Sequence, residues 1–289
     1  MFDLKHYMDE KRVRVNAALE NCLPNENEPP ALLHQAMRYS VLAGGKRLRP
    51  ILVIASAEAF GGSTDDALTP ATAVECLHTY SLIHDDLPAM DDDDLRRGKP
   101  TLHKAFGEAN AILAGDSLLT LAFELLAGAA EAARLTGELA RAAGSRGLAG
   151  GQFEDLASEG ALPELEALIR IHSRKTGCLL SAACRMGAIT AGAGDAEIES
   201  VSLYGAKIGL AFQIVDDILN ATSTTQALGK ATGSDADRKK MSYVALTGID
   251  AARNKARTLL DEAISEIEKT PGSITPLVAL AHYIADRTS

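Results

Sequence analysis

Apolar residues recur at intervals of three and four positions along almost the whole chain, and this helical spacing is the strongest constraint on its fold. Aromatic residues make up 4% of the sequence and Trp is absent, so the residue types that favour β-strands are scarce. Neither strand-like alternation nor a fixed-period repeat is found. With 289 residues, 46% of them hydrophobic, the chain can bury a sizeable core. We expect an all-α protein in which residues 1–289 form a single domain of about ten or more helices.

The positions of apolar residues, prolines and glycines predict where these helices lie. We expect them at roughly 3–22, 31–42, 51–60, 70–86, 104–130, 134–158, 163–190, 196–221, 240–268 and 273–287. The longest polar connection is expected at 221–239, and its length predicts that it covers or completes a site.

The net charge and the cysteine content indicate which class of partner and which cellular compartment the chain suits. The formal net charge of -10 argues against a nucleic-acid partner, because binding to phosphate backbones needs a basic surface. Four scattered Cys residues lack metal-ligand spacing and are typical of reduced thiols in the cytosol. The N-terminal residues do not form a signal peptide, and no run of about 18 uncharged apolar residues occurs. We therefore expect a cytoplasmic protein without a membrane span.

Six of the ten residues from Asp85 to Asp94 are Asp. Pro88 disfavours helix at Leu87, and a bend there would bring Asp91 back beside Asp85. Two carboxylates about 4 Å apart repel by roughly 4 kcal/mol at an effective dielectric near 20, so such a cluster needs cations. All-oxygen ligation with room for water and phosphate suits magnesium. The alternative is a solvated acidic loop.

Basic residues follow this acidic cluster directly, at Arg96, Arg97 and Lys99. Carboxylates and guanidinium groups at one helix end are typical of a site for a magnesium-bridged phosphate. On the preceding helix His78, Ser81 and Asp85 share one face, which predicts a polar environment there. A core histidine is the alternative interpretation of His78.

A second acidic pattern lies on the helix expected at 196–221. Gln213, Asp216 and Asn220 recur at helical spacing, Asp217 adjoins them, and the rest of that helix is apolar. Buried carboxylates are costly unless they are paired or bound to metal. The alternative is an Asp pair at a frayed helix end.

Several cations are placed to bind a diphosphate. Lys46 and Arg49 lie one turn apart after the pair Gly44-Gly45, and Lys175-Thr176-Gly177 interrupts a long helix. Lys230 and Lys240 lie in or just beyond the long polar connection. Two acidic helix ends, several cations and an apolar bundle together predict a diphosphate site with room for a hydrocarbon tail.

The segments GGKRLRP, DDLPAMD followed by RRG, KTG, FQIVDD and LGK stand in an order and spacing similar to the trans-polyprenyl diphosphate synthase family. The resemblance implies an all-α bundle around a deep central cavity, a homodimer, and isoprenoid diphosphate substrates with three Mg²⁺ ions per active site. It also implies residue roles. The metal ligands would be Asp85, Asp91 and Asp216, supported by Asp86 and Asp217. The allylic substrate would be held by Arg96, Lys175, Thr176, Gln213, Lys230 and Lys240. Isopentenyl diphosphate would be held by Gly45, Lys46, Arg49, His78 and Arg97, with Arg287 near the same site.

Two positions depart from the family pattern. Asn220 stands where the second motif normally has a third Asp, so we expect weaker magnesium binding there with activity retained. Val244 replaces a common Pro and is expected to shift a loop slightly.

Tyr80 and Ser81 precede Asp85 by five and four residues, which places them about 6–7.5 Å lower along a helix. An aromatic residue there, with the inserted pair Pro88-Ala89, resembles the farnesyl type, so we expect synthesis of farnesyl diphosphate. A geranylgeranyl product is the alternative. A terpene cyclase is less favoured because of the GGKRLRP segment, which would hold a second diphosphate. A metal phosphohydrolase is less favoured because the His residues form no clear ligand set. A non-catalytic partner subunit is less favoured because the first motif is intact.

Overall fold

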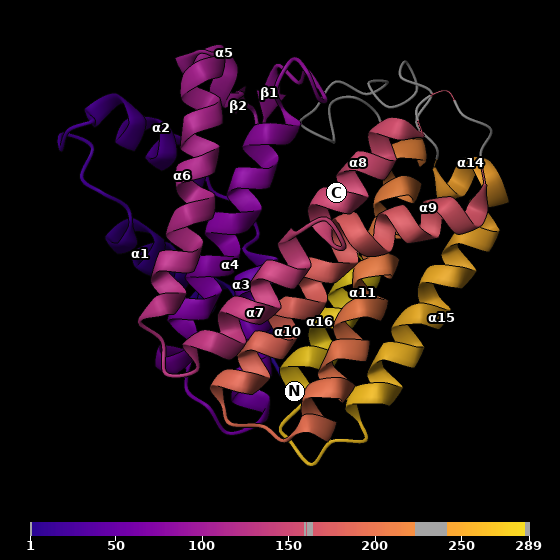
Figure 1. Cartoon of the computed structure of the whole chain (residues 1–289). Helices are drawn as coiled ribbons and strands as arrows, with labels where there is room; N and C mark the ends of the chain where they lie inside the picture. Colours follow the sequence, from indigo (N-terminus) through magenta and orange to yellow (C-terminus); the bar gives the residue numbers. More distant parts are fainter. Residues whose placement is uncertain (1, 159, 161–163, 223–241, 287–289) are drawn as a thin grey trace.

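The computed structural model describes every residue except 1, 159, 161–163, 223–241 and 287–289, and its elements are almost all helical (Figure 1). In chain order the helices are α1 (Leu4–Cys22), α2 (Ala31–Val41), α3 (Leu48–Ala59), α4 (Thr64–Asp85), α5 (Leu102–Phe106), α6 (Glu108–Ala127), α7 (Ala132–Ala143), α8 (Leu148–Ala157), α9 (Leu165–His172), the π-helical turn η1 (Ser173–Gly177), α10 (Cys178–Thr190), α11 (Asp195–Thr222), α14 (Tyr243–Thr247), α15 (Ile249–Ile267) and α16 (Thr275–Ala285). The all-α prediction is confirmed.

Three helices expected from the sequence are divided in the structure. Gly107 and Gly248 adopt φ of 85° and 84°, a backbone conformation that ends one helix and starts the next. They separate α5 from α6 and α14 from α15. The expected helix 134–158 is likewise divided, into α7 and α8. Apolar spacing continues across these short breaks, so periodicity alone does not reveal them.

Helix α4 begins six residues earlier than the expected start at Pro70. The Ser63 hydroxyl accepts a hydrogen bond from the backbone N–H of Asp66, and Asp65 and Asp66 occupy the positive first turn. Pro70 therefore lies inside the helix. The N-terminal capping signal was the better guide to this boundary.

A two-stranded antiparallel hairpin that the sequence did not predict follows the first acidic cluster. Strands β1 (Leu95–Arg96) and β2 (Lys99–Pro100) pair Leu95 with Pro100 and Arg96 with Lys99. Its strands are only two residues long, too short for any alternation to show. The hairpin fixes the direction of the basic residues that follow the Asp run.

Helix α3 lies at the centre of the core and packs against α4 and α10. Ile51, Leu52, Val53 and Ile54 are successive residues and all fully buried, so every side of this helix is covered. Helix α11 packs against α10 and α15, and the buried Tyr204 hydroxyl donates to Leu277 O of α16 at 2.7 Å.

Helices α4 and α11 carry the two acidic patterns at their C-terminal ends. Both ends lie at the top of the molecule in the view of Figure 1, together with β1, β2, α8, α9 and α14. The two acidic patterns, whose nearest acids Asp94 and Asp216 are 122 residues apart in the chain, are therefore brought to one end of the bundle.

Among the described residues α6 is the one helix long and apolar enough, by length and composition, to cross a membrane. Its mean hydropathy is 1.4 and 33% of the tested window is buried. Core helices meet the same criteria, and Asp116 and Glu124 are exposed on it. Ile112 and Leu113 are also exposed, so the exposed side of α6 carries apolar as well as charged side chains.

A buried ion pair holds the loop between α2 and α3. Arg47 Nη1 lies 2.7 Å from Glu75 Oε1 of α4, and the two side chains are 1% and 2% exposed. Arg47 also donates to Val41 O and to Asn16 Oδ1, and these bonds keep it in a left-handed conformation with φ 51°. The loop that contains Lys46 is thereby fixed to α4.

We expect Glu75→Gln to lower the free energy of unfolding by about 3–5 kcal/mol, because the Arg47 charge would stay buried without a counter-charge. Urea denaturation followed by circular dichroism measures this loss. Asp9→Asn is the control, since its pair with Arg12 is 43–46% exposed and contributes about 1 kcal/mol or less. A loss as small as that of the control would show that Arg47 is solvated or paired in another way.

Candidate active site

The end of α4 bends so that two carboxylates of the first acidic cluster stand side by side. The Asp91 backbone N–H donates to Asp85 O at 2.7 Å, and Met90 N–H donates to Leu87 O at 2.8 Å. This tight turn surrounds Pro88, and it confirms the predicted return of Asp91 to Asp85.

The charge of Asp85 is incompletely balanced by the protein. The pKa of Asp85 is raised to about 6, first by burial and then by the neighbouring charges of Asp91 and Asp86, while Lys175 and Arg96 act against this rise. A cation placed between Asp85 and Asp91 would relieve this repulsion. The pair therefore has the charge and the oxygen donors that a divalent ion requires.

Asp86 turns to a different partner, the guanidinium of Arg96 on β1. Arg96 Nε donates to Asp86 Oδ1 at 2.8 Å and to Oδ2 at 2.7 Å, and Asp86 is 3% exposed. Arg96 Nη2 also lies 3.6 Å from Asp93 Oδ2. Asp86 thus neutralises and orients a basic side chain at the edge of the acidic cluster.

Lys175 belongs to the π-helical turn η1, a wide turn of a kind often found at functional sites. Its Nζ lies 2.7 Å from Asp155 Oδ2 of α8. Burial alone would lower the pKa of Lys175, but the charges of Asp155, Asp85 and Asp91 outweigh it and raise the pKa. The Lys175 side chain is therefore a charged group close to Asp85 and Asp91 of the first acidic cluster.

Asp155 was not among the residues singled out from the sequence. A signal was present, because Gly150-Gly151 inside a helical pattern indicates close packing. A Cβ at Gly151 would lie 2.3 Å from the Lys175 backbone nitrogen. This close approach of α8 to η1 is what brings Asp155 within reach of Lys175.

Thr176 and Gln213 link η1 to α11. The Thr176 hydroxyl donates to Gln213 Oε1 at 2.5 Å, and a Cβ at Gly209 would lie 2.6 Å from Gly177 Cα. Asp216 follows Gln213 by three residues on the same face of α11 and is half-buried. The second acidic pattern is therefore fastened to the turn that carries Lys175.

Asp217, next to Asp216, anchors a neighbouring segment. Its Oδ2 accepts from Tyr243 N–H of α14 at 2.6 Å and lies 3.9 Å from His172 Nε2. Burial, with a further contribution from Lys175, lowers the pKa of His172 to about 4, so the imidazole is neutral at pH 7. Asn220 is exposed at the end of α11, and Val244 is half-buried in α14.

The second basic group lies around the start of α3. Arg49 donates from Nη1 to His78 Nε2 at 3.0 Å, and burial together with Arg49 and Arg97 lowers the pKa of His78 well below its usual value. A neutral His78 accepts from Arg49 and orients it. Lys46 Nζ lies 6.0 Å above the Tyr283 ring of α16.

Arg97 joins the hairpin to the glycine loop. Its Nη1 donates to Gly44 O, and a Cβ at Gly45 would lie 2.7 Å from the guanidinium carbon. Only glycine therefore lets Arg97 approach this loop. Gly45, Lys46, Arg49, His78 and Arg97 thus lie in one region between α3, α4 and the hairpin.

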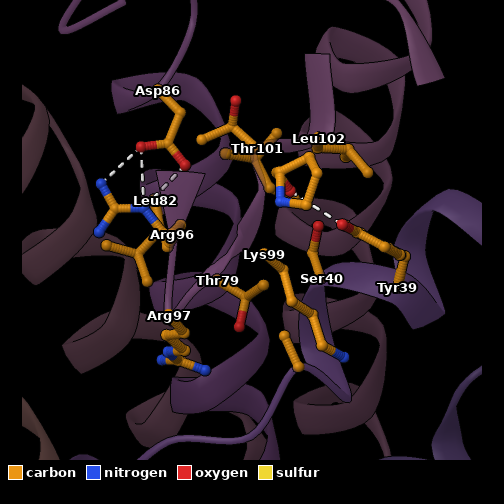
Figure 2. Close-up of a pocket in the computed structure, with 13 residues that line it drawn as sticks. Tyr39, Ser40, Thr79, Leu82, Asp86, Arg96, Arg97, Lys99, Thr101 and Leu102 are labelled. Atoms are coloured by element: carbon orange, nitrogen blue, oxygen red, sulfur yellow. Dashed lines mark hydrogen bonds and ion pairs between the residues drawn. The ribbon is translucent and has the colours of Figure 1, made fainter. Parts of the chain in front are cut away.

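Beside this region a pocket opens between α2, α4 and the hairpin (Figure 2). Asp86, Arg96, Arg97 and Lys99 line one part of it, and its apolar part comes from residues such as Leu82. Figure 2 also shows the Tyr39 hydroxyl bonded to Pro100 O, at 2.9 Å, which ties α2 to β2. The basic residues are therefore reachable from solvent.

Tyr80 and Ser81 lie on different faces of α4. Ser81 is buried and its hydroxyl donates to His78 O at 2.8 Å, whereas Tyr80 is half-buried and packs toward α6. Three further residues named from the sequence, Lys230, Lys240 and Arg287, lie outside the described residues.

The described side chains do not enclose a metal by themselves. In residues 2–158, 160, 164–222 and 242–286, no three His, Cys, Asp or Glu side chains are grouped as a metal site. An ion held by Asp85 and Asp91 would thus complete its coordination with water or with oxygens of a bound diphosphate, as Mg²⁺ commonly does. The donor set fits a metal that arrives with its substrate.

Comparison with known proteins gives the same family in sequence and in structure. Residues 30–281 match the family described as polyprenyl synthetase. A chloroplastic geranylgeranyl pyrophosphate synthase of Catharanthus roseus is 49% identical over 294 residues, covering 99% of this chain and 82% of that protein. Farnesyl diphosphate synthase of Escherichia coli is also 49% identical, over 276 residues, covering 92% of this chain and 91% of that protein.

Among solved structures, the geranyltransferase of Helicobacter pylori, complexed with magnesium and isoprenyl diphosphate, superposes with a TM-score of 0.84. It is 36% identical, and the match covers 97% of this chain and 95% of that chain. The matches in sequence and in structure thus extend over almost the whole chain. This chain therefore belongs to the polyprenyl synthetase family and is a prenyltransferase.

Proposed function

We propose that the chain is a farnesyl diphosphate synthase, which joins isopentenyl diphosphate to dimethylallyl diphosphate and then to geranyl diphosphate. The observation that carries this proposal is the closeness of Asp85 and Asp91 to Lys175, whose pKa both carboxylates raise. Two acids and a lysine from separate helices suit a metal-bridged diphosphate. The chain is 49% identical both to a farnesyl and to a geranylgeranyl synthase. Synthesis of a C20 diphosphate is therefore the second candidate function.

Magnesium is proposed as the cofactor, with three ions at Asp85, Asp91 and Asp216. The support is the raised pKa of Asp85 together with the magnesium bound in the Helicobacter pylori relative. When bound, the metal supplies positive charge that stabilises the departing pyrophosphate. Asn220 stands where the second motif normally has its third Asp, and it is expected to lower metal affinity without abolishing activity.

Arg96, Lys175, Thr176 and Gln213 would hold the allylic diphosphate, with Lys230 and Lys240 assigned to it by family resemblance. Lys175 stabilises negative charge as the allylic C–O bond breaks in a site shielded from water. The double bond of isopentenyl diphosphate then attacks the allylic cation, and the proton released from the new adduct passes to the pyrophosphate.

Lys46, Arg49 and Arg97 would hold the diphosphate of the isopentenyl substrate. His78 contributes through Arg49, because its neutral Nε2 accepts the Arg49 hydrogen bond and orients the guanidinium group. Arg97 would exchange its bond to Gly44 O for one to the substrate. Gly45 gives the backbone room for this approach.

We also propose a homodimer formed through α6. The support is a pair of adjacent apolar side chains exposed on this helix, Ile112 at 43% and Leu113 at 55%. A second copy of the chain would cover these side chains and reduce the unfavourable exposure.

Incubation of the protein with isopentenyl and dimethylallyl diphosphates should give mainly a C15 diphosphate when magnesium is present and no condensation in a chelator. Chromatography that separates prenyl diphosphates by length measures both. A mainly C20 product would keep the reaction and reject the farnesyl assignment, whereas no product at any magnesium concentration would reject the enzymatic proposal.

Tyr80→Ala should lengthen the product, because the ring that blocks the growing tail is removed. We expect a rise of roughly tenfold in the ratio of C20 to C15, the discrimination typical of a small change in an apolar pocket. Tyr80→Phe keeps the ring and should keep the C15 product. An unchanged ratio in Tyr80→Ala would exclude this residue as the stop.

Sedimentation velocity should report twice the mass of one chain at micromolar concentration. Leu113→Asp should shift this population toward one chain, because a charge would be buried in the interface. Val13→Asp is the matched control, since Val13 is 67% exposed on α1. A single-chain mass for the unaltered protein would contradict the dimer.

A further inference from the structure

A slot in the surface of α6 receives the side chain of His84. The slot exists because residue 115 is Gly: a Cβ there would lie 2.2 Å from His84 Nε2 and 2.5 Å from Cδ2, whereas ordinary contacts begin at 3.4 Å. The imidazole therefore lies against the backbone of α6, closer than any other residue type at position 115 would permit.

Two polar contacts with α6 hold the imidazole in this slot. His84 Nε2 lies 3.2 Å from Ile112 O and 3.8 Å from Asp116 Oδ1. These two α6 residues are one helical turn apart and stand on either side of Gly115 in the sequence. The side chain of His84 is 27% exposed, so it is sheltered by the two helices without being sealed between them.

The ring of Tyr80 packs on His84 from within α4. The two residues are four apart on one helical face, and their ring centroids are 5.3 Å apart at an interplanar angle of 85°. This edge-to-face arrangement lies in the favourable range for aromatic pairs. His84 thus contacts both the Tyr80 ring and the backbone of α6.

We propose that His84, seated in the Gly115 slot, is a positioning residue that sets the Tyr80 ring and thereby the chain length of the product. This inference rests on the proposed function, in which Tyr80 stops the growing tail. Removal of the imidazole opens space behind Tyr80, and the ring can retreat toward α6. Addition of a methyl group at residue 115 drives the imidazole outward, toward Tyr80, by about 1 Å or more, since 2.2 Å must become at least 3.4 Å.

A purely structural role for His84 predicts a different result. If the residue only fastened α4 to α6, its replacement would lower stability or overall rate and would leave the proportions of the products unchanged. Compared at equal conversion of isopentenyl diphosphate, the ratio of product lengths does not depend on the amount of active enzyme. It therefore separates positioning of Tyr80 from simple stabilisation.

The test compares product lengths from the unaltered protein, His84→Ala, Gly115→Ala and Tyr80→Ala. We expect His84→Ala to raise the ratio of C20 to C15 roughly tenfold, in the direction of Tyr80→Ala. We expect Gly115→Ala to raise the share of C10, because Tyr80 is pressed into the path of the tail. Gly128→Ala is the matched control, since a Cβ at this end of α6 meets nothing within 4 Å.

An unchanged ratio in folded His84→Ala, with a longer product from Tyr80→Ala, would overturn this inference and leave the proposed function intact. If His84→Ala fails to fold by circular dichroism, the ratio given by Gly115→Ala decides instead. Unchanged products from both Tyr80→Ala and His84→Ala would overturn this inference together with the chain-length account on which it rests. Loss of condensation in the unaltered protein would reject the proposed function itself.

Discussion

The hydrogen bond from Asp91 N–H to Asp85 O is the constraint on which the site depends. Without it the chain beyond Pro88 would carry the acidic run away from the helix end. With it, two carboxylates that repel one another are held together at one end of the bundle. Lys175 offsets part of this repulsion, and the proposed metal ion would offset the remainder.

Helix α4 and its C-cap residue Asp86 combine four tasks. Its residues turn by about 100° each, so Asp85 faces the acidic cluster while Asp86, one residue later, faces the hairpin and Arg96. Tyr80 and His84 face α6. Further down the same helix, Glu75 fixes the glycine loop through Arg47. A displacement of α4 would therefore affect metal binding, both basic groups and the proposed stop together.

The sequence predicted the features that depend on local spacing and missed those that depend on distant partners. Helical class followed from periodicity, and the bend at Pro88 followed from proline sterics. The early start of α4 was missed because the expected helix began at Pro70, whereas the Ser63 cap starts the helix at Thr64. The pairing of Lys175 with Asp155, 20 residues away, has no local signature beyond a glycine pair. The same holds for Arg47 and Glu75, which meet only in the folded chain.

The π-helical turn that carries Lys175 is enclosed by backbone on two sides. Gly151 brings α8 against the Lys175 nitrogen, and Gly209 brings α11 against Gly177. Main-chain atoms cannot change rotamer to make room, so Gly151 and Gly209 in this wall tolerate almost no substitution by a larger residue. The α4–α6 side is lined by side chains that can be exchanged for one another. A search for new products is therefore directed to that side and not to the wall around the lysine.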